Sequence, residues 1–430
     1  MSYKKNIASN ILTQIINIVL GFLTSIIVVR SLGPDGQGYI AYFILIFGLI
    51  ADYGDLGINS ATTYFQKKSA YSQEEVYNVN ISFLLIICSI ISGVVIVLKN
   101  LNLILNNYSF YIILCGLIFV VFRIITSCVQ NLYLGNEKIV DINRYLIINN
   151  FIKFVLITVF SLTGLLSVKV YFLVITLGTA LNAVLLLKNI KLKYKFKINL
   201  SLLKKEFKYG IIIYFAILFS FLNYRVDQFL IERKLGTSEL GVYSVGVLLA
   251  ELLLLIPVSV NTALAGRLYN MDVRSKEMSF ITSLTAKYTF YISLLIAVVG
   301  YCMTPLIPVI YGSDFLRASE VFIILLGGIV FASIGKSSAP YFVVKGKPTI
   351  YLVITSIALL SNIILNLVLI PLYGINGAAV ASLFSYFLYG MLHICFFVFK
   401  EKIRLGDFFI INAFDLNLLK QIFTNKKTGD

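Results

Sequence analysis

Charged residues are scarce in this sequence, which holds 13% Asp, Glu, Lys and Arg against 59% hydrophobic residues. A soluble domain carries roughly 25% charged and about 45–50% apolar residues. The composition therefore excludes a large soluble core and indicates a chain that lies mostly in a membrane. The net charge of +16 would suggest nucleic acid as the partner of a soluble protein. Here the lysines fall between apolar stretches, where the positive-inside rule and anionic lipid account for them, and we expect no nucleic acid.

Cysteine and histidine are also few, and their spacing excludes the sites they usually build. The five cysteines are scattered along apolar stretches, with no C-x-x-C pair and no histidine beside them. They predict neither disulfides nor a metal centre. The single histidine, His393, lies in the last apolar stretch, and we expect it to be packed or to face a pore rather than to be catalytic. We therefore expect no metal and no cofactor.

Enzyme motifs are missing as well. Gly335-Lys336-Ser337 resembles the end of a phosphate-binding loop, but Val330 stands where the first glycine of that motif belongs. No loop before the C-terminal tail is long enough to hold a catalytic domain, and no external loop carries a cluster of acids. The sequence therefore predicts a protein that is not an enzyme.

Apolar segments long enough to cross the bilayer fill most of the chain, since a spanning helix takes about 20 mainly apolar residues. They predict an all-α integral membrane protein with about 12 transmembrane helices. Pro257 is expected to kink the eighth of them. The first is too long for a signal-peptide core and has no cleavage site after it, so we expect it to be retained. The segments lie near residues 7–30, 38–64, 77–98, 110–131, 145–164, 168–188, 209–231, 239–264, 279–301, 316–337, 349–370 and 373–399.

The basic residues predict how these segments are oriented. If both termini are cytoplasmic, most lysines and arginines fall on the cytoplasmic side, including those of a basic connector at 189–208. The connector is predicted to be a solvated linker that touches anionic headgroups, and the tail at 400–430 to contain an interfacial amphipathic helix. The opposite side then holds few cations, namely Arg30, Lys99, Lys169, Arg233, Lys234 and Arg317.

A short motif occurs twice and indicates a duplication. Leu32-Gly33-x4-Gly38 and Leu235-Gly236-x4-Gly241 share the pattern L-G-x4-G, each has a cation just before it, and each joins two apolar segments. We therefore predict an N-terminal six-helix bundle at 1–188 and a C-terminal one at 209–399, joined by the connector.

Several charged residues fall inside the predicted spans, where a charge costs a few kcal/mol and usually faces a cavity. Arg225 and Asp227 are two apart and cannot pair on one helix face, whereas Asn223 and Asp227 can. Glu251 is a candidate counter-ion for Arg225 or Arg123. Two interpretations stay open, buried structural pairing and a water-filled cationic lumen. The charges concerned are Arg123, Lys153, Arg225, Asp227, Glu251 and Lys287.

Polar side chains in the first two spans allow two interpretations each. Asn10, Gln14 and Asn17 share one helix face, which in lipid must meet protein or water. They either form helix–helix hydrogen bonds or line a cavity. Asp52 and Asp55 share a face of the second span and either hold a proton or Na⁺ or form an ordinary pair at a helix end.

Taken in order, these motifs resemble the polysaccharide-unit (Wzx-type) flippases of the multidrug/oligosaccharidyl-lipid/polysaccharide transporter superfamily. The resemblance covers roughly residues 1 to 400. It is carried by Leu32-Gly33-x4-Gly38, Arg225-x-Asp227, Leu235-Gly236-x4-Gly241-x-Tyr243, Pro305-Leu-Ile-Pro-Val-Ile-Tyr-Gly312-x-x-Phe315-x-x-Ala318 and Asn366-Leu-Val-Leu-Ile-Pro371-Leu-Tyr-Gly374-Ile-Asn-Gly377.

The resemblance implies two bundles related by a pseudo-two-fold axis in a V-shaped MATE-like fold, in the bacterial plasma membrane. It also implies flipping of an undecaprenyl-diphosphate-linked repeat unit to the outer leaflet for O-antigen or capsule synthesis. We expect alternating access, with polysaccharide polymerase or assembly proteins as possible partners. Two alternatives are a cation-coupled multidrug exporter of the same superfamily and a non-transporting scaffold of an envelope-assembly complex. The expected site has a cationic lumen (Arg123, Arg225, Lys287, Lys153, Arg30), a polar lining (Asn10, Gln14, Asn17, Asn223) and candidate proton- or Na⁺-coupling acids (Asp52, Asp55, Asp227, Glu251).

Overall fold

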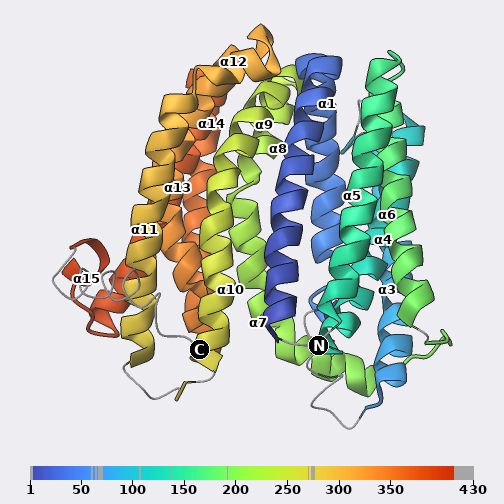
Figure 1. The fold of residues 1–430 in the computed structure, drawn as a ribbon, viewed down its shortest axis with the longest axis horizontal. Coiled ribbons are helices and arrows are strands. Elements are labelled where there is room, and N and C mark those ends of the chain that lie inside the picture. The colour runs from blue at the N-terminus through green and yellow to red at the C-terminus, as the bar shows by residue number, and fades with distance from the viewer. Residues whose placement is uncertain are drawn as a thin grey trace. The chain divides into compact units, whose positions relative to one another are not determined.

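The computed structural model describes residues 3–59, 62, 65, 71–105, 108–136, 138–190, 192–269, 271–272 and 277–410. Throughout this described part the chain is built of helices and the turns between them (Figure 1). The helices are α1 (Tyr3–Tyr53), α3 (Gln73–Asn100), α4 (Phe110–Gly135), α5 (Ile139–Leu162), α6 (Val168–Ile190), α7 (Leu200–Asn223), α8 (Val226–Leu235), α9 (Thr237–Glu251), α10 (Leu255–Tyr269), α11 (Glu277–Met303), α12 (Leu306–Tyr311), α13 (Leu316–Val344), α14 (Pro348–Phe399) and α15 (Gly406–Phe409), with 3-10 turns η1 (Leu252–Leu254) and η2 (Ser313–Phe315).

Among the described residues, nine helices or continuous helical runs are long and apolar enough to cross a membrane, and Tyr214–Asn223 is a shorter apolar stretch. Most of the predicted segments are confirmed as helices. The exceptions are segment 38–64, where α1 already ends at Tyr53, and segment 209–231, which is divided between α7 and α8. The kink predicted at Pro257 stays a prediction, although the helix changes its hydrogen bonding just before this residue. Pro257 has no N–H to give the Leu253 carbonyl, and the 3-10 turn η1 separates α9 from α10 there.

The chain divides into two compact units. Unit 1 comprises Met1–Phe221, Arg225–Val245 and Pro305–Ser319. Unit 2 comprises Leu222–Tyr224, Gly246–Thr304 and the chain from Glu320 onward. These units follow contacts in space rather than the sequence repeat, so the predicted boundaries of the two six-helix halves stay a prediction.

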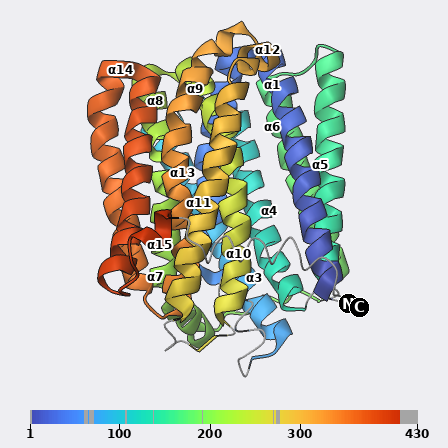
Figure 2. The ribbon, with the colours of Figure 1, turned by 60° about the vertical axis from the view of Figure 1, so that its left-hand side comes forward.

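Unit 1 is centred on α1, which packs against α4 and α5, while α6 packs against the same two helices (Figures 1 and 2). The rings of Phe43 and Phe172 stack at 4.0 Å, and Phe47 packs beside Phe43. Gly116 on α4 makes room for these rings, since a Cβ atom there would lie 2.4 Å from the Phe47 ring. The core of unit 1 is therefore aromatic and closely packed.

Unit 2 holds α11 against α10 and α15, and an aromatic cluster joins α13 to α14. His393 is fully buried in this cluster, with Nδ1 2.9 Å from the Tyr389 carbonyl oxygen and its ring against Phe342. Of the two alternatives for His393, the packed one is confirmed. The predicted tail helix falls mainly on residues 411–430, which lie outside the described part.

Four glycines break the helices in the same way. Each follows a Leu or Tyr and has a positive φ, which glycine adopts without steric cost. They are Gly33 (64°), Gly236 (92°), Gly312 (107°) and Gly374 (59°). Two of these breaks belong to the repeated L-G-x4-G motif, so the motif marks a turn of the backbone between helical segments.

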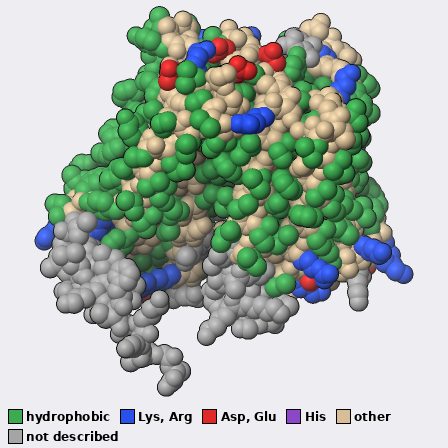
Figure 3. All heavy atoms as spheres, turned by 45° about the horizontal axis from the view of Figure 1, so that its top comes forward, with side chains coloured by type: hydrophobic (Ala, Val, Ile, Leu, Met, Phe, Trp, Pro, Cys, Tyr) green, Lys and Arg blue, Asp and Glu red, His purple; other side chains and the backbone are tan. Residues whose placement is uncertain are grey.

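The two copies of that motif touch each other within unit 1. A Cβ atom on Gly38 would lie 1.8 Å from the Thr237 carbonyl oxygen, and one on Gly241 would lie 1.9 Å from the Pro34 carbonyl oxygen. The second glycine of each copy is therefore needed for close backbone contact. On the face shown in Figure 3, hydrophobic side chains cover most of the surface, and most charged side chains lie toward the top and the bottom of the view.

Candidate functional site

An ion pair joins two apolar helices of unit 1. Arg123, near the middle of α4, donates from Nε to Asp52 Oδ1 on α1 at 3.2 Å. The two side chains are 51% and 46% exposed. Because a charged group facing hydrocarbon is costly, this exposure indicates that the pair faces water or a polar partner. The sequence analysis named both residues but did not pair them.

A second cation stands beside this pair. The ammonium group of Lys153 on α5 lies within electrostatic range of the Arg123 guanidinium. The methylene groups of Lys153 pack on Gly178 of α6, where a Cβ atom would lie 2.7 Å from Lys153 Cδ. One turn away, Asn150 Nδ2 donates to Asn17 Oδ1 on α1 at 2.8 Å. We call Arg123, Lys153, Asp52, Asn17 and Asn150 the cationic patch.

The backbone unwinds directly after Asp52. Leu56 and Gly57 have positive φ values of 54° and 84°, so the helix cannot continue through them. Asp55 is buried and accepts hydrogen bonds from the Gly57 and Asn59 backbone N–H groups, both at 3.1 Å. Asp52 and Asp55 therefore have different partners, a cation for the first and the freed backbone for the second.

Arg30 is bound to backbone at the break in α1. It donates to the carbonyl oxygens of Val309 at 2.5 Å and Ile310 at 2.7 Å. These carbonyls belong to the last turn of α12, where a cation complements the helix dipole. Arg30 thus holds α12 against α1 in unit 1.

The motif Arg225-x-Asp227 lies where α7 ends and α8 begins. Asp227 is buried and accepts from the Tyr243 hydroxyl at 2.5 Å and the Gln228 N–H at 2.7 Å. Arg225 is half-buried before α8, 5.8 Å from the Phe221 ring. Asn223 belongs to unit 2, where its backbone carbonyl accepts from Asn362 and its Oδ1 accepts from Ser385.

Each remaining predicted residue is described within its own unit. Lys287 in unit 2 is 2% exposed and donates to the Ile410 carbonyl oxygen at 3.3 Å, which holds the segment after α15 on α11. Glu251 is half-buried at the end of α9. Gln14 is exposed on α1, and the side chain of Asn10 lies outside the described residues. The structure thus brings Arg123, Lys153, Asp52 and Asn17 together within unit 1.

Sequence reasoning missed Asn150. Asn149 and Asn150 stand four and three positions before Lys153 in a predicted span, so these polar residues share one face of the helix. The same spacing argument that identified Asn10, Gln14 and Asn17 would have found it.

Comparisons with known proteins agree with this architecture. A family model described as "Polysaccharide biosynthesis protein" matches residues 3–269. The capsular polysaccharide biosynthesis protein CapF of Staphylococcus aureus is 23% identical over 392 residues, which are 89% of this chain and 96% of that protein. The resemblance inferred from the motifs is therefore confirmed.

Solved structures show the fold. The lipid II flippase MurJ, in an inward closed conformation, matches with a TM-score of 0.76 at 18% identity over 98% of this chain and 94% of its own. An inward-facing multidrug resistance MATE family transporter of the MOP superfamily matches with a TM-score of 0.72 at 12% identity over 91% of this chain and 95% of its own. The chain is thus a multi-pass membrane protein of MATE-like fold, and it belongs to the polysaccharide biosynthesis protein family.

Proposed function

We propose that this protein moves an undecaprenyl-diphosphate-linked oligosaccharide from the cytoplasmic to the outer leaflet of a bacterial plasma membrane by alternating access. Membership of the polysaccharide biosynthesis family supports the substrate class. The observation that carries the proposal is the cationic patch, in which two cations and one carboxylate are grouped on apolar helices of unit 1 with Arg123 and Asp52 exposed.

The chemistry of the patch suits a diphosphate. A diphosphate cannot cross hydrocarbon without partners, because an unpaired charge in an apolar medium is very costly. The planar Arg123 guanidinium matches phosphate oxygens in two-point hydrogen bonding, and Lys153 adds a point charge. Asp52 offsets one of the two cations, so the patch keeps a net positive charge when all three groups are ionised. Asn17 and Asn150 supply amide groups that suit sugar hydroxyls.

The membrane potential favours the proposed direction. Moving one elementary charge across 100 mV is worth about 2.3 kcal/mol, so two negative charges moved outward from an inside-negative cell gain about twice that. In this scheme both termini and the basic connector are cytoplasmic. The further candidate substrate-binding residues are Arg225, Lys287, Arg30, Gln14, Asn10 and Asn223, and the candidate coupling acids are Asp55, Asp227 and Glu251.

The test is complementation of a flippase-null strain. We expect Arg123→Ala to abolish surface polysaccharide while the variant still reaches the membrane, because the diphosphate loses its two-point partner. Arg123→Lys should recover only part of the activity. The matched control is Arg144→Ala, since Arg144 is an exposed arginine near the start of α5 and outside the patch. Full activity of Arg123→Ala would remove the patch from the mechanism, and drug resistance on overexpression would favour an exporter instead.

A further inference from the structure

A buried carboxylate lies near the start of α7, before the apolar part of that helix. Glu206 is fully buried, and its Oε1 accepts from Asn80 Nδ2 on α3 at 3.2 Å. Asn80 is also fully buried, and its Nδ2 donates to Thr62 Oγ1 at 3.0 Å as well. The family comparison and the motifs assign no role to either residue.

Two acceptor atoms in this contact lack a donor among the described residues. Within the described residues, neither Glu206 Oε2 nor Asn80 Oδ1 has a hydrogen-bond partner. A buried apolar cluster lies beside this contact. It is formed by residues of α3, of α7 and of the chain before α3, namely Val76, Val79, Leu202, Leu203, Ile58 and Phe65. A buried carboxylate of this kind is stable only with a cation or in its neutral form.

The charged groups nearby that the structure describes do not supply that cation. Lys205, next in sequence, is exposed and donates to the Tyr71 hydroxyl at 3.3 Å. Lys197 pairs with Glu75 at 2.8 Å. The Cys128 thiol of α4 lies within electrostatic range of Glu206 and of Asp55. Neither the thiol nor the Asp55 carboxyl group can carry a positive charge.

We propose that Glu206 is a proton-binding site, and that the bound proton holds the first turns of α7 on α3. A proton on Oε2 removes the charge from the apolar cluster and converts an orphaned acceptor into a donor. Loss of the proton leaves a carboxylate that is stable only in water, which favours separation of the start of α7 from α3. This inference does not depend on the proposed function. In agreement with it, burial raises the pKa of Glu206 to about 7.

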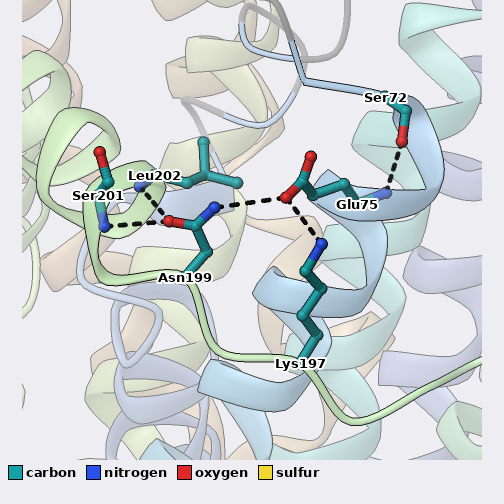
Figure 4. Close-up of polar contacts among 6 residues, drawn as sticks. All are labelled: Ser72, Glu75, Lys197, Asn199, Ser201 and Leu202. Carbon is teal, nitrogen blue, oxygen red and sulfur yellow. Dashed lines mark hydrogen bonds and ion pairs between the residues drawn. The ribbon is translucent and has the colours of Figure 1, made fainter.

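The connector would move with the start of α7, because α3 holds both segments through hydrogen bonds (Figure 4). Lys197 Nζ and Asn199 Nδ2 donate to Glu75 Oε1 on α3, at 2.8 and 3.3 Å. Asn199 Oδ1 in turn accepts from the backbone N–H groups of Ser201 and Leu202, both at 3.1 Å, and so caps α7. The polar contacts of Glu75 and the buried Glu206–Asn80 contact thus hold one continuous segment on α3. This segment is the end of the connector together with the start of α7.

Hydrogen–deuterium exchange of the purified full chain at pH 6 and pH 8 tests the proposal. With a pKa of about 7 when docked and 4.5 when solvated, opening of Leu200–Lys208 should increase about tenfold between these pH values. Glu206→Gln keeps the shape without the titration, so it should remove this increase once intrinsic exchange is corrected. Glu75→Gln is the control, because it weakens the contact between Glu75 and Lys197. It should increase the opening of Leu200–Lys208 by the same factor at both pH values.

The proposal is overturned if wild type and Glu206→Gln show the same change between pH 6 and pH 8. If Glu206→Gln does not fold, exchange is compared between pH 6 and pH 8 in wild type and in Glu75→Gln. Absence of the tenfold increase from both proteins would also overturn the proposal. Each measurement is repeated with sodium replaced by choline. Protection at pH 8 that requires sodium would assign the site to a metal ion and refute the proton.

Discussion

Gly38 on α1 lies so close to Thr237 that its replacement by alanine is expected to destabilise unit 1. The new Cβ atom would lie 1.8 Å from the Thr237 carbonyl oxygen, whereas Cβ atoms essentially never come within 3.0 Å of another heavy atom. The two backbones would have to move apart by more than an ångström. Overpacking of this kind costs about 1–3 kcal/mol, and rigid backbone on both sides places Gly38→Ala at the upper end or above.

The assay is thermal unfolding of the purified protein in detergent. Gly93→Ala is the matched control, since Gly93 lies within α3 and a Cβ atom there has nothing within 4 Å. It should leave stability unchanged or raise it by up to about 1 kcal/mol through helix propensity. Gly38→Ala and Gly241→Ala together should cost less than the sum of the two, because one separation accommodates both methyl groups. If Gly38→Ala has the same melting temperature as the wild type, the close contact between the two motifs is wrong.

Three further changes should alter stability in defined directions. Tyr243→Phe takes a donor from the buried carboxylate of Asp227 and should cost about 1.5–3 kcal/mol in denaturant unfolding, whereas an unchanged midpoint would mean that water replaces the hydroxyl. Leu56→Gly should raise stability by about 1 kcal/mol, because Leu56 has a φ of 54°, and a loss would show that its side chain packs. The neutral form of Glu206 stabilises the fold fully below pH 4.5, and this stability is lost as the pH rises to about 7. This loss of stability corresponds to roughly 3 kcal/mol, and Glu206→Gln should abolish it. If Glu206→Gln leaves the pH profile of the melting temperature unchanged, the prediction is contradicted.

The sequence predicted the helices well, because spanning segments need long apolar runs and the glycine breaks follow a repeated motif. It also identified the residues of the cationic patch except Asn150. Their partners could not be predicted, because the pairing of Arg123 with Asp52 depends on how α4 packs against α1. Spacing along one helix carries no information about such a contact.

Glu206 was missed for a different reason. The connector was predicted to be a solvated linker through residue 208, since lysines dominate it. The lysines from Lys193 to Lys197 are indeed exposed, but α7 begins already at Leu200 and turns Glu206 inward onto α3. An acid among lysines gives no signal of burial until the apolar face of the helix, with Leu202 and Leu203, is recognised.

The unwound turn after Asp52 has a mechanical consequence. An intact membrane helix can bend sharply only by breaking hydrogen bonds and exposing amides to lipid. The backbone N–H groups of Gly57 and Asn59 already donate hydrogen bonds to the carboxylate of Asp55, which belongs to the same loop. A change of angle at this loop therefore costs fewer backbone hydrogen bonds than bending an intact helix would, and the loop lies within a few residues of the Arg123 ion pair.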